Sequence, residues 1–314
     1  MAQVELPLVD RAGNPMAFRR ISESHGLAGV APWQRTGPNG LDVTVHTSSG
    51  ARTLSFRAQT PEAPGQTITI SWKGKLSDMG GGPAATALAR KMLGLERDLS
   101  EFLSLADADP DLDWVREAGA GAMARGATAF EDVIRTILTT NCSWALTVKM
   151  CQLLVAHAGE AEPGSEKGSH IGRAFPAAAA MAGMSELEFQ EKVRVGYRAG
   201  RLRGLSNDVA SGKTNIEGLA DADPVELPDA KLQEELLALP GVGPYAAAHI
   251  MLLLGRPAGV ILDSWTRPKY ARITGRSKVT DAEIRKRVNR YGPDAGLALW
   301  LILSRDWFDS SAPA

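Results

Sequence analysis

The sequence Leu239-Pro-Gly-Val-Gly-Pro-Tyr245 is the stretch that decides the fold. It follows residues 229–239, a segment rich in Ala, Leu, Glu, Gln and Lys, which predicts a helix. Glycine adopts backbone angles that other residues avoid, and we expect Gly241 and Gly243 to use that freedom in a tight turn. Proline favours the first position of a helix, so a second helix is expected from about Pro244. The stretch therefore predicts a helix, a glycine hairpin and a second helix, whose N-terminus can hold a phosphate.

This turn has two other interpretations besides the hairpin. Residues 241–246 fit the dinucleotide-binding pattern G-x-G-x-x-A, but that pattern needs a strand before it. The helix-forming composition of residues 229–239 disfavours such a strand. The other interpretation is an ordinary corner between two helices, and the residues of the turn alone leave it open.

Composition and charge define the class of protein. The chain has 314 residues, of which 44% are hydrophobic and 23% charged, as in globular proteins, and its length favours two or three lobes. The formal net charge is −1, but the charges are polarised. Residues 265–290 hold nine Lys and Arg against two acids and residues 192–203 five against none, whereas residues 95–132 hold ten acids against three basic residues. This distribution suits a protein that binds a polyanion on one face, although solvated helix surfaces can look the same.

Two cysteines, Cys142 and Cys151, are too few for a disulfide framework or for a four-cysteine zinc or iron–sulfur site made by this chain. The N-terminus lacks the basic segment and apolar core of a signal peptide. The most apolar run, residues 246–254, is too short to span a bilayer. We therefore expect a cytoplasmic protein that acts as a monomer and has no membrane partner.

The pattern of apolar residues changes along the chain. Residues 1–82 are expected to form a β-rich domain, and three segments in it have strand character: 41–46, 52–57 and 67–72. Residues 83–314 are expected to be helical. Three helix starts carry Ser or Thr followed three residues later by Glu: Thr128, Ser185 and Thr280. Residues 204–228 show few helix signals and are expected to be a linker. The fold class is therefore mainly α with an N-terminal β-rich domain (α+β).

Three blocks of sequence together resemble the helix–hairpin–helix DNA glycosylase superfamily. The first is the hairpin followed by Val260-Ile-Leu-Asp263-Ser-Trp265, with the aspartate 20 residues beyond Gly243. The other two are residues 130–144 and residues 93–99. The similarity covers residues 90–308, and the β-rich start more loosely. It implies base excision repair on double-stranded DNA. A damaged base would be flipped into a cleft between two helical lobes, where its N-glycosidic bond is hydrolysed.

Two departures from the family pattern indicate which branch of the superfamily this chain resembles. No cysteine follows Cys151, so the C-terminal iron–sulfur loop of some branches is absent. The chain is thus similar to the cluster-free alkyladenine and 8-oxoguanine branch. The family's bifunctional lyases carry a Schiff-base lysine at the second residue after the last hairpin glycine, where this chain has Tyr245. Tyrosine has no amine that could form an imine, so we expect a monofunctional glycosylase without lyase activity.

The resemblance also implies roles for single residues. Asp263 is the expected catalytic group, because a carboxylate stabilises the positively charged sugar of the transition state, and its alternative role is a helix N-cap. Asn141 aligns with the residue that fills the gap left by the base, and its alternative role is a helix C-cap. The aromatic candidates for the base pocket are Trp144, Tyr245, Trp265 and Trp300, and for Trp300 core packing is favoured.

Contacts with DNA phosphates are expected from backbone amides and from basic side chains. The amides are those of Gly241, Gly243 and Tyr245, and the side chains are those of Arg267, Lys269 and Arg272. The backbone carbonyls that match the family's site for Na⁺ or K⁺ are those of Leu237, Leu239 and Val242. No other cofactor is expected. The spacing of three histidines does not suit a metal, and each is interpreted as structural or exposed: His157, His170 and His249.

The damaged base itself is left open by the sequence. An N-alkylated purine carries a positive charge and leaves without acid help, whereas a neutral oxidised base needs a protonating or hydrogen-bonding partner. A single carboxylate among aromatic residues favours an alkylated purine of the 3-methyladenine type. The Asn-containing loop at residue 141 favours 8-oxoguanine, and other modified bases stay open. An alternative of another class is a non-catalytic protein that keeps the hairpin and binds DNA structure.

Overall fold

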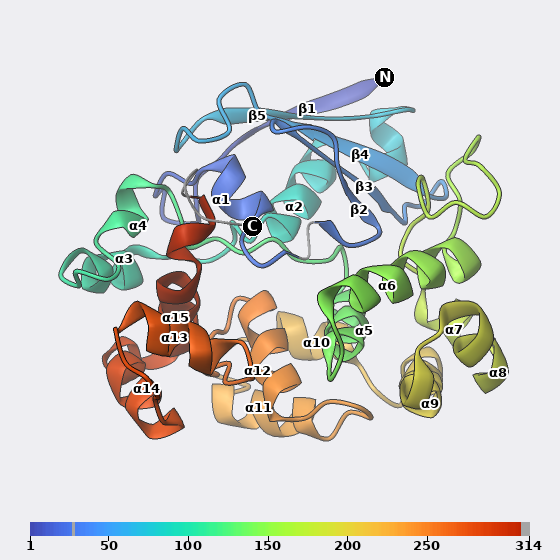
Figure 1. The fold of residues 1–314 in the computed structure, drawn as a ribbon. Helices are drawn as coiled ribbons and strands as arrows, with labels where there is room; N and C mark the ends of the chain where they lie inside the picture. Colours follow the sequence, from blue (N-terminus) through green and yellow to red (C-terminus); the bar gives the residue numbers. More distant parts are fainter. Residues whose placement is uncertain (27–28, 309–314) are drawn as a thin grey trace.

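The structure is a computed structural model that describes residues 1–26 and 29–308 (Figure 1). Five antiparallel strands form one sheet in the order β1-β5-β4-β3-β2. The strands are β1 (Ala2–Pro7), β2 (Trp33–Arg35), β3 (Gly40–Val45), β4 (Arg52–Arg57) and β5 (Thr67–Trp72). The three predicted strands are confirmed as β3, β4 and β5, while β1 and β2, the two edge strands, were not predicted. The sheet lies above most of the helices in Figure 1.

Alternation of apolar and polar residues gives the sheet one strongly buried face. In the register of β3 and β4, Val43 is opposite Leu54 and Leu41 is opposite Phe56, and all four side chains are buried. Because successive side chains of a strand point to opposite faces, residues two apart share a face and pack together. This face is covered by helix α2, whose residue Ala89 is buried in the same hydrophobic cluster.

Helices make up most of the remaining chain. The longer ones are α2 (Gly82–Met92), α3 (Ser100–Asp107), α5 (Ala129–Thr139), α6 (Trp144–Ala158), α9 (Ala199–Ala210), α11 (Asp229–Leu237), α12 (Pro244–Leu253), α13 (Thr266–Ile273), α14 (Asp281–Val288) and α15 (Ala295–Ser304). The short ones are α1 (Phe18–Ser22), α4 (Trp114–Glu117), α7 (Ala178–Ala182), α8 (Glu186–Glu188) and α10 (Ile216–Asp221). Single turns of other helix types are η2 (Leu76–Met79), η3 (Phe189–Val193), η4 (Gly196–Arg198), η5 (Asn289–Asp294) and η6 (Arg305–Phe308).

The predicted helix starts are confirmed, with one difference. The reciprocal capping box forms at Ser185 and at Thr280. At Thr128 only half of it forms: the Thr128 hydroxyl accepts the amide of Glu131, but the Glu131 carboxylate binds Arg135 at 2.6 Å. The expected linker at residues 204–228 is wrong, because α9 continues through its first part and α10 follows.

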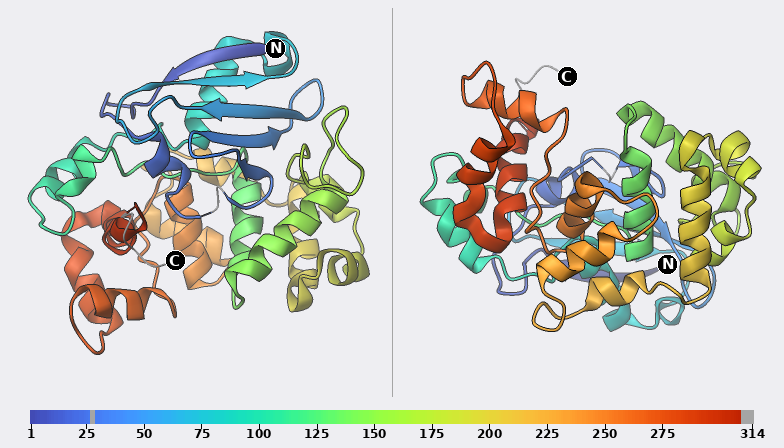
Figure 2. Two further views of the ribbon diagram at one scale, coloured as in Figure 1. Left: turned by 45° about the horizontal axis from the view of Figure 1, so that its top comes forward. Right: turned by 90° about the horizontal axis from the view of Figure 1, so that it is seen from below.

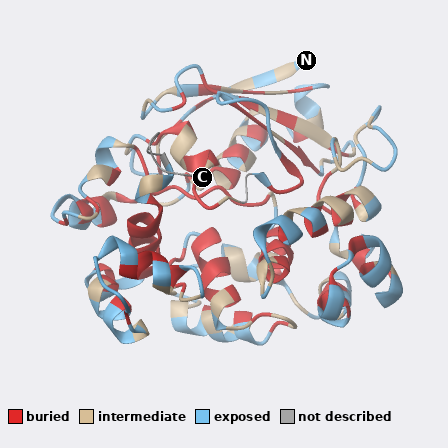
Figure 3. Cartoon of the chain, viewed as in Figure 1, coloured by how far each residue is buried: buried red, intermediate tan, exposed pale blue. Residues whose placement is uncertain are grey.

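Two hydrophobic clusters meet at helix α12. One joins the sheet to α2, α3 and the C-terminal helices α13–α15, and the other joins α5, α6, α9 and α11. Helix α12 contributes Ala248 and Leu252 to the first cluster, and Ile250 and Met251 to the second. A helix that is apolar on all sides is buried on all sides, and α12 and α15 are largely red in Figure 3. Seen from below, α11 and α12 lie between the C-terminal helices and the helices α5–α9 (Figure 2). No helix in residues 1–26 and 29–308 is long and apolar enough to cross a membrane.

Candidate active site

The predicted hairpin is confirmed as the turn between α11 and α12. The amide of Val242 donates to the carbonyl of Leu239 at 3.1 Å and closes the turn. Gly241 has φ +90°, in the left-handed region that glycine tolerates, as expected. Gly243 has φ −107° and ψ −177°, an extended conformation open to any residue. The expectation that both glycines need special angles is therefore wrong for Gly243.

The absence of a side chain at Gly243 has a different consequence. A Cβ atom built there would meet nothing within 4 Å, so the backbone at the start of α12 is bare. Gly243 is the N-cap of α12, and the first amides of a helix have no acceptor within it. These amides and the positive end of the helix dipole together favour an anion. The predicted phosphate contacts at Gly241, Gly243 and Tyr245 lie on this turn.

A cavity of about 1070 Å³ lies next to the hairpin. It is lined by the α5–α6 loop, the start of α12, the loop before α13 and parts of α15 and η6. Ile261 and Trp300 belong to the first hydrophobic cluster and Ala246 to the second, so the cavity lies where the two clusters meet. Segments far apart in sequence thus form one site.

Asp263 lies in the wall of this cavity, partly exposed. Its Oδ1 accepts the amides of Trp265 at 2.9 Å and Thr266 at 2.6 Å, at the start of α13. These bonds satisfy helix amides and fix the orientation of the carboxylate. Oδ2 accepts no hydrogen bond from the part of the chain that the structure describes. The helix cap weighed as an alternative for Asp263 therefore coexists with a free carboxylate oxygen beside the cavity.

Aromatic rings form much of the cavity wall. The rings of Trp265, Trp300 and Trp307 pack against one another with centroids 5.8–5.9 Å apart. Trp265 is 39% exposed, whereas Trp300 is buried and donates from Nε1 to the Ser24 carbonyl at 2.6 Å. Trp144 comes from a distant part of the sequence, at the start of α6, and is 48% exposed.

The structure adds to the aromatic residues predicted from sequence. Trp144, Tyr245 and Trp265 all line the cavity. Trp300, expected in the core, is both buried and in the wall. Trp307 was not predicted. It lies seven residues before the last residue of the sequence, and no motif marks it.

Two histidines of the wall were also missed. His249 was interpreted as structural or exposed, and His25 was not considered, yet both line the cavity and both are buried. Nε2 of His25 donates to the carbonyl of Ala124. Burial lowers the pKa of His25 to about 3, helped by the neighbouring His249. Burial also lowers the pKa of His249 to about 4, and it outweighs the opposing effect of the Asp263 carboxylate. Both imidazoles are therefore neutral at pH 7.

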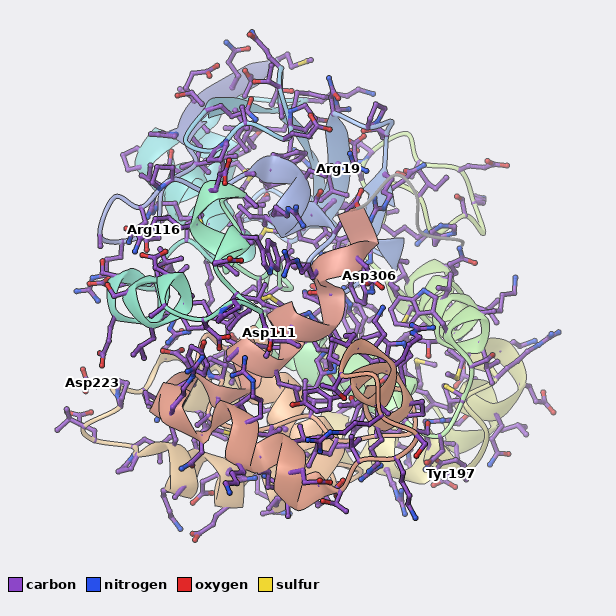
Figure 4. The ribbon with its side chains drawn as sticks, turned by 60° about the vertical axis from the view of Figure 1, so that its left-hand side comes forward. Arg19, Asp111, Arg116, Tyr197, Asp223 and Asp306 are labelled. Atoms are coloured by element: carbon purple, nitrogen blue, oxygen red, sulfur yellow. The ribbon has the colours of Figure 1, made fainter. Side chains whose placement is uncertain are left out.

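Asn141, the predicted gap filler, lies in the α5–α6 loop at the cavity. It has φ +49°, the left-handed conformation that Asn adopts more readily than most residues. Its Nδ2 donates to the hydroxyl of Tyr197 at 3.2 Å. Tyr197 was not predicted, although it stands in the basic segment 192–203. Its ring is 56% exposed and is labelled in Figure 4.

Two guanidinium groups stack near the exposed ring of Tyr197. The guanidinium carbons of Arg198 and Arg201 lie 4.6 and 5.6 Å from its centroid. The hydrogen bond from Asn141 is the main cause that lowers the pKa of the Tyr197 phenol. An exposed aromatic ring flanked by cations is typical of a surface that contacts nucleic acid.

The three predicted phosphate-binding side chains have different surroundings. Arg267 binds Asp281 with two nitrogens, at 2.7 and 3.0 Å. Lys269 is buried and pairs with the carboxylate of Asp306, which Figure 4 labels on the C-terminal segment. A contact of Lys269 with DNA would require breaking this pair. Arg272 is exposed. The DNA contacts of all three stay predictions.

Side chains form no metal-binding site among the residues that the structure describes. No group of three or more His, Cys, Asp or Glu in them could hold a metal ion. Cys142 lies at the cavity and Cys151 is buried, and both are free thiols. Of the three carbonyls predicted to bind a monovalent cation, that of Leu239 already accepts the amide of Val242.

Comparisons with known proteins gave matches to solved structures only: no family model and no curated protein matches the chain. The apo 8-oxoguanine glycosylase/lyase of Clostridium acetobutylicum superposes with a TM-score of 0.72 at 19% identity, over 96% of each chain. Its complex with double-stranded DNA containing cytosine opposite 8-oxoguanine gives 0.71 at 18% identity, over 93% of this chain and 92% of that one.

A third match is the 3-methyladenine DNA glycosylase of Archaeoglobus fulgidus, with a TM-score of 0.72 at 18% identity, over 99% of this chain and all of that one. The matches span the sheet and the helical part alike, so they confirm the fold that the sequence resemblance implied. The chain has the fold of these DNA glycosylase structures.

Proposed function

We propose that the protein is a DNA N-glycosylase that acts as a monomer on double-stranded DNA containing a damaged base. The observation that carries the proposal is the position of Asp263, a carboxylate held at a cavity with aromatic walls beside the phosphate-binding hairpin. The three solved structures of the same fold, two of an 8-oxoguanine glycosylase/lyase and one of a 3-methyladenine glycosylase, support this activity.

A base inside a duplex must rotate out of the stack before its glycosidic bond can be reached. The hairpin amides would hold one phosphate, since Gly243 leaves the backbone open to close approach. Asn141 and Tyr197 lie at the entrance and would occupy the space that the base leaves. The aromatic rings of the wall would then stack on the extruded base.

Hydrolysis needs a charge near the sugar. As the bond between C1′ and the base nitrogen breaks, its electron pair leaves with the base and positive charge develops on the sugar. The carboxylate of Asp263 would stabilise that charge and orient a water molecule. The water oxygen would bond to C1′, and the proton that the water loses would pass to the free Oδ2 of Asp263 and from there to solvent. The products are a free base and an abasic site.

We further propose that the enzyme is monofunctional. A lyase needs an amine that attacks C1′ and forms an imine with the sugar. Tyr245 stands at the position of the family's lysine, and its hydroxyl lies 3.3 Å from Oγ1 of Thr139. No lysine is among the described residues that line the cavity.

We favour an N-alkylated purine as the substrate because the cavity offers no evident acid. Both imidazoles in its wall are neutral at pH 7, so neither is a ready proton donor. An N-alkylated purine already carries a positive charge, and it needs no proton to leave. Its cation would also be attracted by the faces of the aromatic rings. 8-Oxoguanine is the alternative substrate, and it is favoured by the Asn141 loop.

The proposal is tested by a screen for released bases. Purified protein is incubated with duplex DNA treated with dimethyl sulfate, and with duplexes that carry one 8-oxoguanine or one hypoxanthine, and free bases are separated by chromatography. We expect release of methylated purines by the wild type, and a loss of at least about 100-fold in Asp263→Asn. Asp208→Asn is the matched control, because Asp208 pairs with Lys213 on the surface of α9.

The outcomes separate the candidate functions. Release of 8-oxoguanine alone would replace the proposed substrate and keep the activity. Binding to these duplexes without release of any base would refute catalysis and favour a DNA-structure-binding protein.

A monovalent cation at the hairpin is a further part of the proposal. The carbonyls of Leu237, Leu239 and Val242 would hold Na⁺ or K⁺, and the second lone pair of the Leu239 carbonyl remains for it. The ion would add positive charge next to the phosphate. Its test is DNA affinity in K⁺ against tetramethylammonium at equal ionic strength; equal affinities would refute it.

A further inference from the structure

His249 is a polar residue at a buried position in the cavity wall, where an apolar side chain would lose no hydrogen bonds to water. It lies one helical turn after Tyr245 on α12, so both side chains face the same side. Its ring centroid is 5.9 Å from that of Tyr245, 5.7 Å from that of Trp300 and 6.2 Å from that of His25. The imidazole is thus enclosed by rings next to the aromatic wall.

The two ring nitrogens of His249 are unsatisfied. The residue is 6% exposed, and neither Nδ1 nor Nε2 has a hydrogen-bond partner among residues 1–26 and 29–308. A buried polar group without a partner costs about 1–3 kcal/mol, and native proteins hold few of them. The three rings that contact it do have partners: Trp300 donates from Nε1 to Ser24, Nε2 of His25 donates to Ala124, and the Tyr245 hydroxyl lies 3.3 Å from Oγ1 of Thr139. The nitrogens of His249 therefore indicate a ligand that enters the cavity.

The charge state of His249 limits what this ligand can be. Asp263 favours the protonated ring, whereas burial and the Arg135 guanidinium oppose it, and the neutral form prevails at pH 7. His25, the other imidazole that faces it, is neutral as well, and burial raises the pKa of the Tyr245 phenol, which is neutral too. A neutral imidazole offers one N–H donor and one lone pair and does not repel a cation.

We infer that His249 contacts the extruded base and accepts a hydrogen bond from an N–H group on the edge of an N-alkylated purine. The inference rests on the proposed function and deepens it, since it names the residue that selects the base. Alkylation gives the purine ring a positive charge, which makes its N–H groups stronger donors. A hydrogen bond from a charged donor is worth about twice a neutral one, so His249 favours a cationic base over a neutral base.

The test compares two bases that share an N1–H group and differ in charge. Duplexes carry either 7-methylguanine, which is cationic, or hypoxanthine, which is neutral. Single-turnover release is measured for the wild type, His249→Phe and His249→Asn. Phe keeps an aromatic ring against Tyr245 and Trp300 but has no nitrogen, while Asn keeps a polar acceptor. His157→Phe is the matched control on the outer surface of α6, where His157 faces Glu188.

We expect His249→Phe to lower release of 7-methylguanine about tenfold more than release of hypoxanthine, the effect of losing one hydrogen bond from a charged donor. His249→Asn, which keeps a hydrogen-bond acceptor, should recover part of the wild-type preference for 7-methylguanine over hypoxanthine. Binding to a duplex with a tetrahydrofuran abasic site, which has no base to contact, should stay within about twofold of wild type; this separates a base contact from a disturbed fold.

Each other outcome identifies what has failed. Suppose the wild type releases bases and His249→Phe keeps the same ratio of 7-methylguanine to hypoxanthine release. Then His249 does not contact the base, and its ring nitrogens bind water instead. If His249→Phe does not fold, His249→Leu, which also lacks a ring nitrogen, takes its place, and a ratio of 7-methylguanine to hypoxanthine release equal to that of the wild type overturns the inference. If the wild type releases neither these bases nor those of the wider screen, the proposed function itself is refuted and the inference with it.

Discussion

The side-chain amide of Asn141 donates to the hydroxyl of Tyr197 at 3.2 Å, and this bond joins the α5–α6 loop to the turn η4 in the wall of the cavity. Asn141 is held in a left-handed conformation, and Tyr197 is flanked by the guanidinium groups of Arg198 and Arg201. The pair therefore presents an amide and an exposed ring next to each other, on a surface that carries positive charge.

Replacing Tyr197 should weaken binding to damaged DNA. Tyr197→Ala removes a ring that can stack on a base, an interaction worth about 1–3 kcal/mol, so the Kd for a duplex with an abasic-site analogue should rise about tenfold. Tyr197→Phe keeps the ring and loses the hydroxyl that binds Asn141 and Thr140, and its Kd should rise about threefold or less. Fluorescence anisotropy at fixed salt measures both. Equal affinities of Tyr197→Ala and the wild type would show that Tyr197 does not contact DNA.

The enzyme should leave the DNA strand intact after base removal. With Tyr245 in place of an amine donor, no imine forms, so reduction with borohydride should trap no protein–DNA adduct. Strand cleavage should appear only after hot alkali. Tyr245→Phe should behave in the same way, since the phenol has no part in a lyase step. A trapped adduct in either protein would contradict the assignment.

Replacing Arg272 should change the salt dependence of DNA binding, whereas replacing Lys269 should change the stability of the fold. Arg272 is exposed, and if it contacts a phosphate, Arg272→Ala should reduce the slope of log Kd against log salt by about one. Lys269 is buried against Asp306, so Lys269→Ala should lower the free energy of unfolding by about 1–3 kcal/mol, measured by urea titration. A stability loss in Arg272→Ala instead, or a changed slope in a stable Lys269→Ala, would reverse the two roles.

Acid should destabilise the fold through the buried histidines. The folded pKa of His249 is about 4 against 6.5 for the ordinary group, so between these values the unfolded chain binds a proton that the folded one does not. Stability then falls as the pH falls through this window, by about 2 kcal/mol between pH 7 and pH 5 for this residue. His249→Phe removes the titrating group, and its free energy of unfolding should decline less over this range by that amount. His157→Phe, on the surface, should decline as the wild type does. A decline in His249→Phe as steep as that of the wild type would show that His249 is not held neutral.

Local signals in the sequence predicted the elements that shape the site. The hairpin followed from two glycines and a proline after a helix-forming segment, and three strands followed from alternation. The edge strand β2 was missed because its three residues are too few to show alternation. The edge strand β1 does alternate, in Ala2-Gln-Val-Glu-Leu6, so its signal was present in the sequence and was overlooked. The linker expected at residues 204–228 was wrong because burial of Leu202 and Leu205 on α9 outweighs the weak helix propensity of the polar residues that follow.

The cavity wall was predicted only where a residue lay close to a motif. Tyr245 and Trp265 adjoin the hairpin and Asp263, and Trp144 follows Asn141. Trp307, His25 and Tyr197 come from distant segments, and only tertiary packing brings them to the same space. His249 stood within the predicted helix, but its spacing gave no metal site, and burial without hydrogen-bond partners cannot be read from a sequence.

The two hairpin glycines should respond in opposite ways to alanine. Gly241 has φ +90°, which strains any residue with a Cβ, so Gly241→Ala should lower the free energy of unfolding by about 1–2 kcal/mol. Gly243 is extended and a Cβ there meets nothing, so Gly243→Ala should fold with nearly the stability of the wild type. Its methyl group would instead stand over the amides at the start of α12, where a phosphate must approach the backbone. We therefore expect Gly243→Ala to raise the Kd for DNA at least about tenfold, measured beside the urea midpoint of the same sample. Unchanged DNA affinity in a stable Gly243→Ala would place the phosphate away from this turn, and the hairpin would then serve only as a corner between two helices.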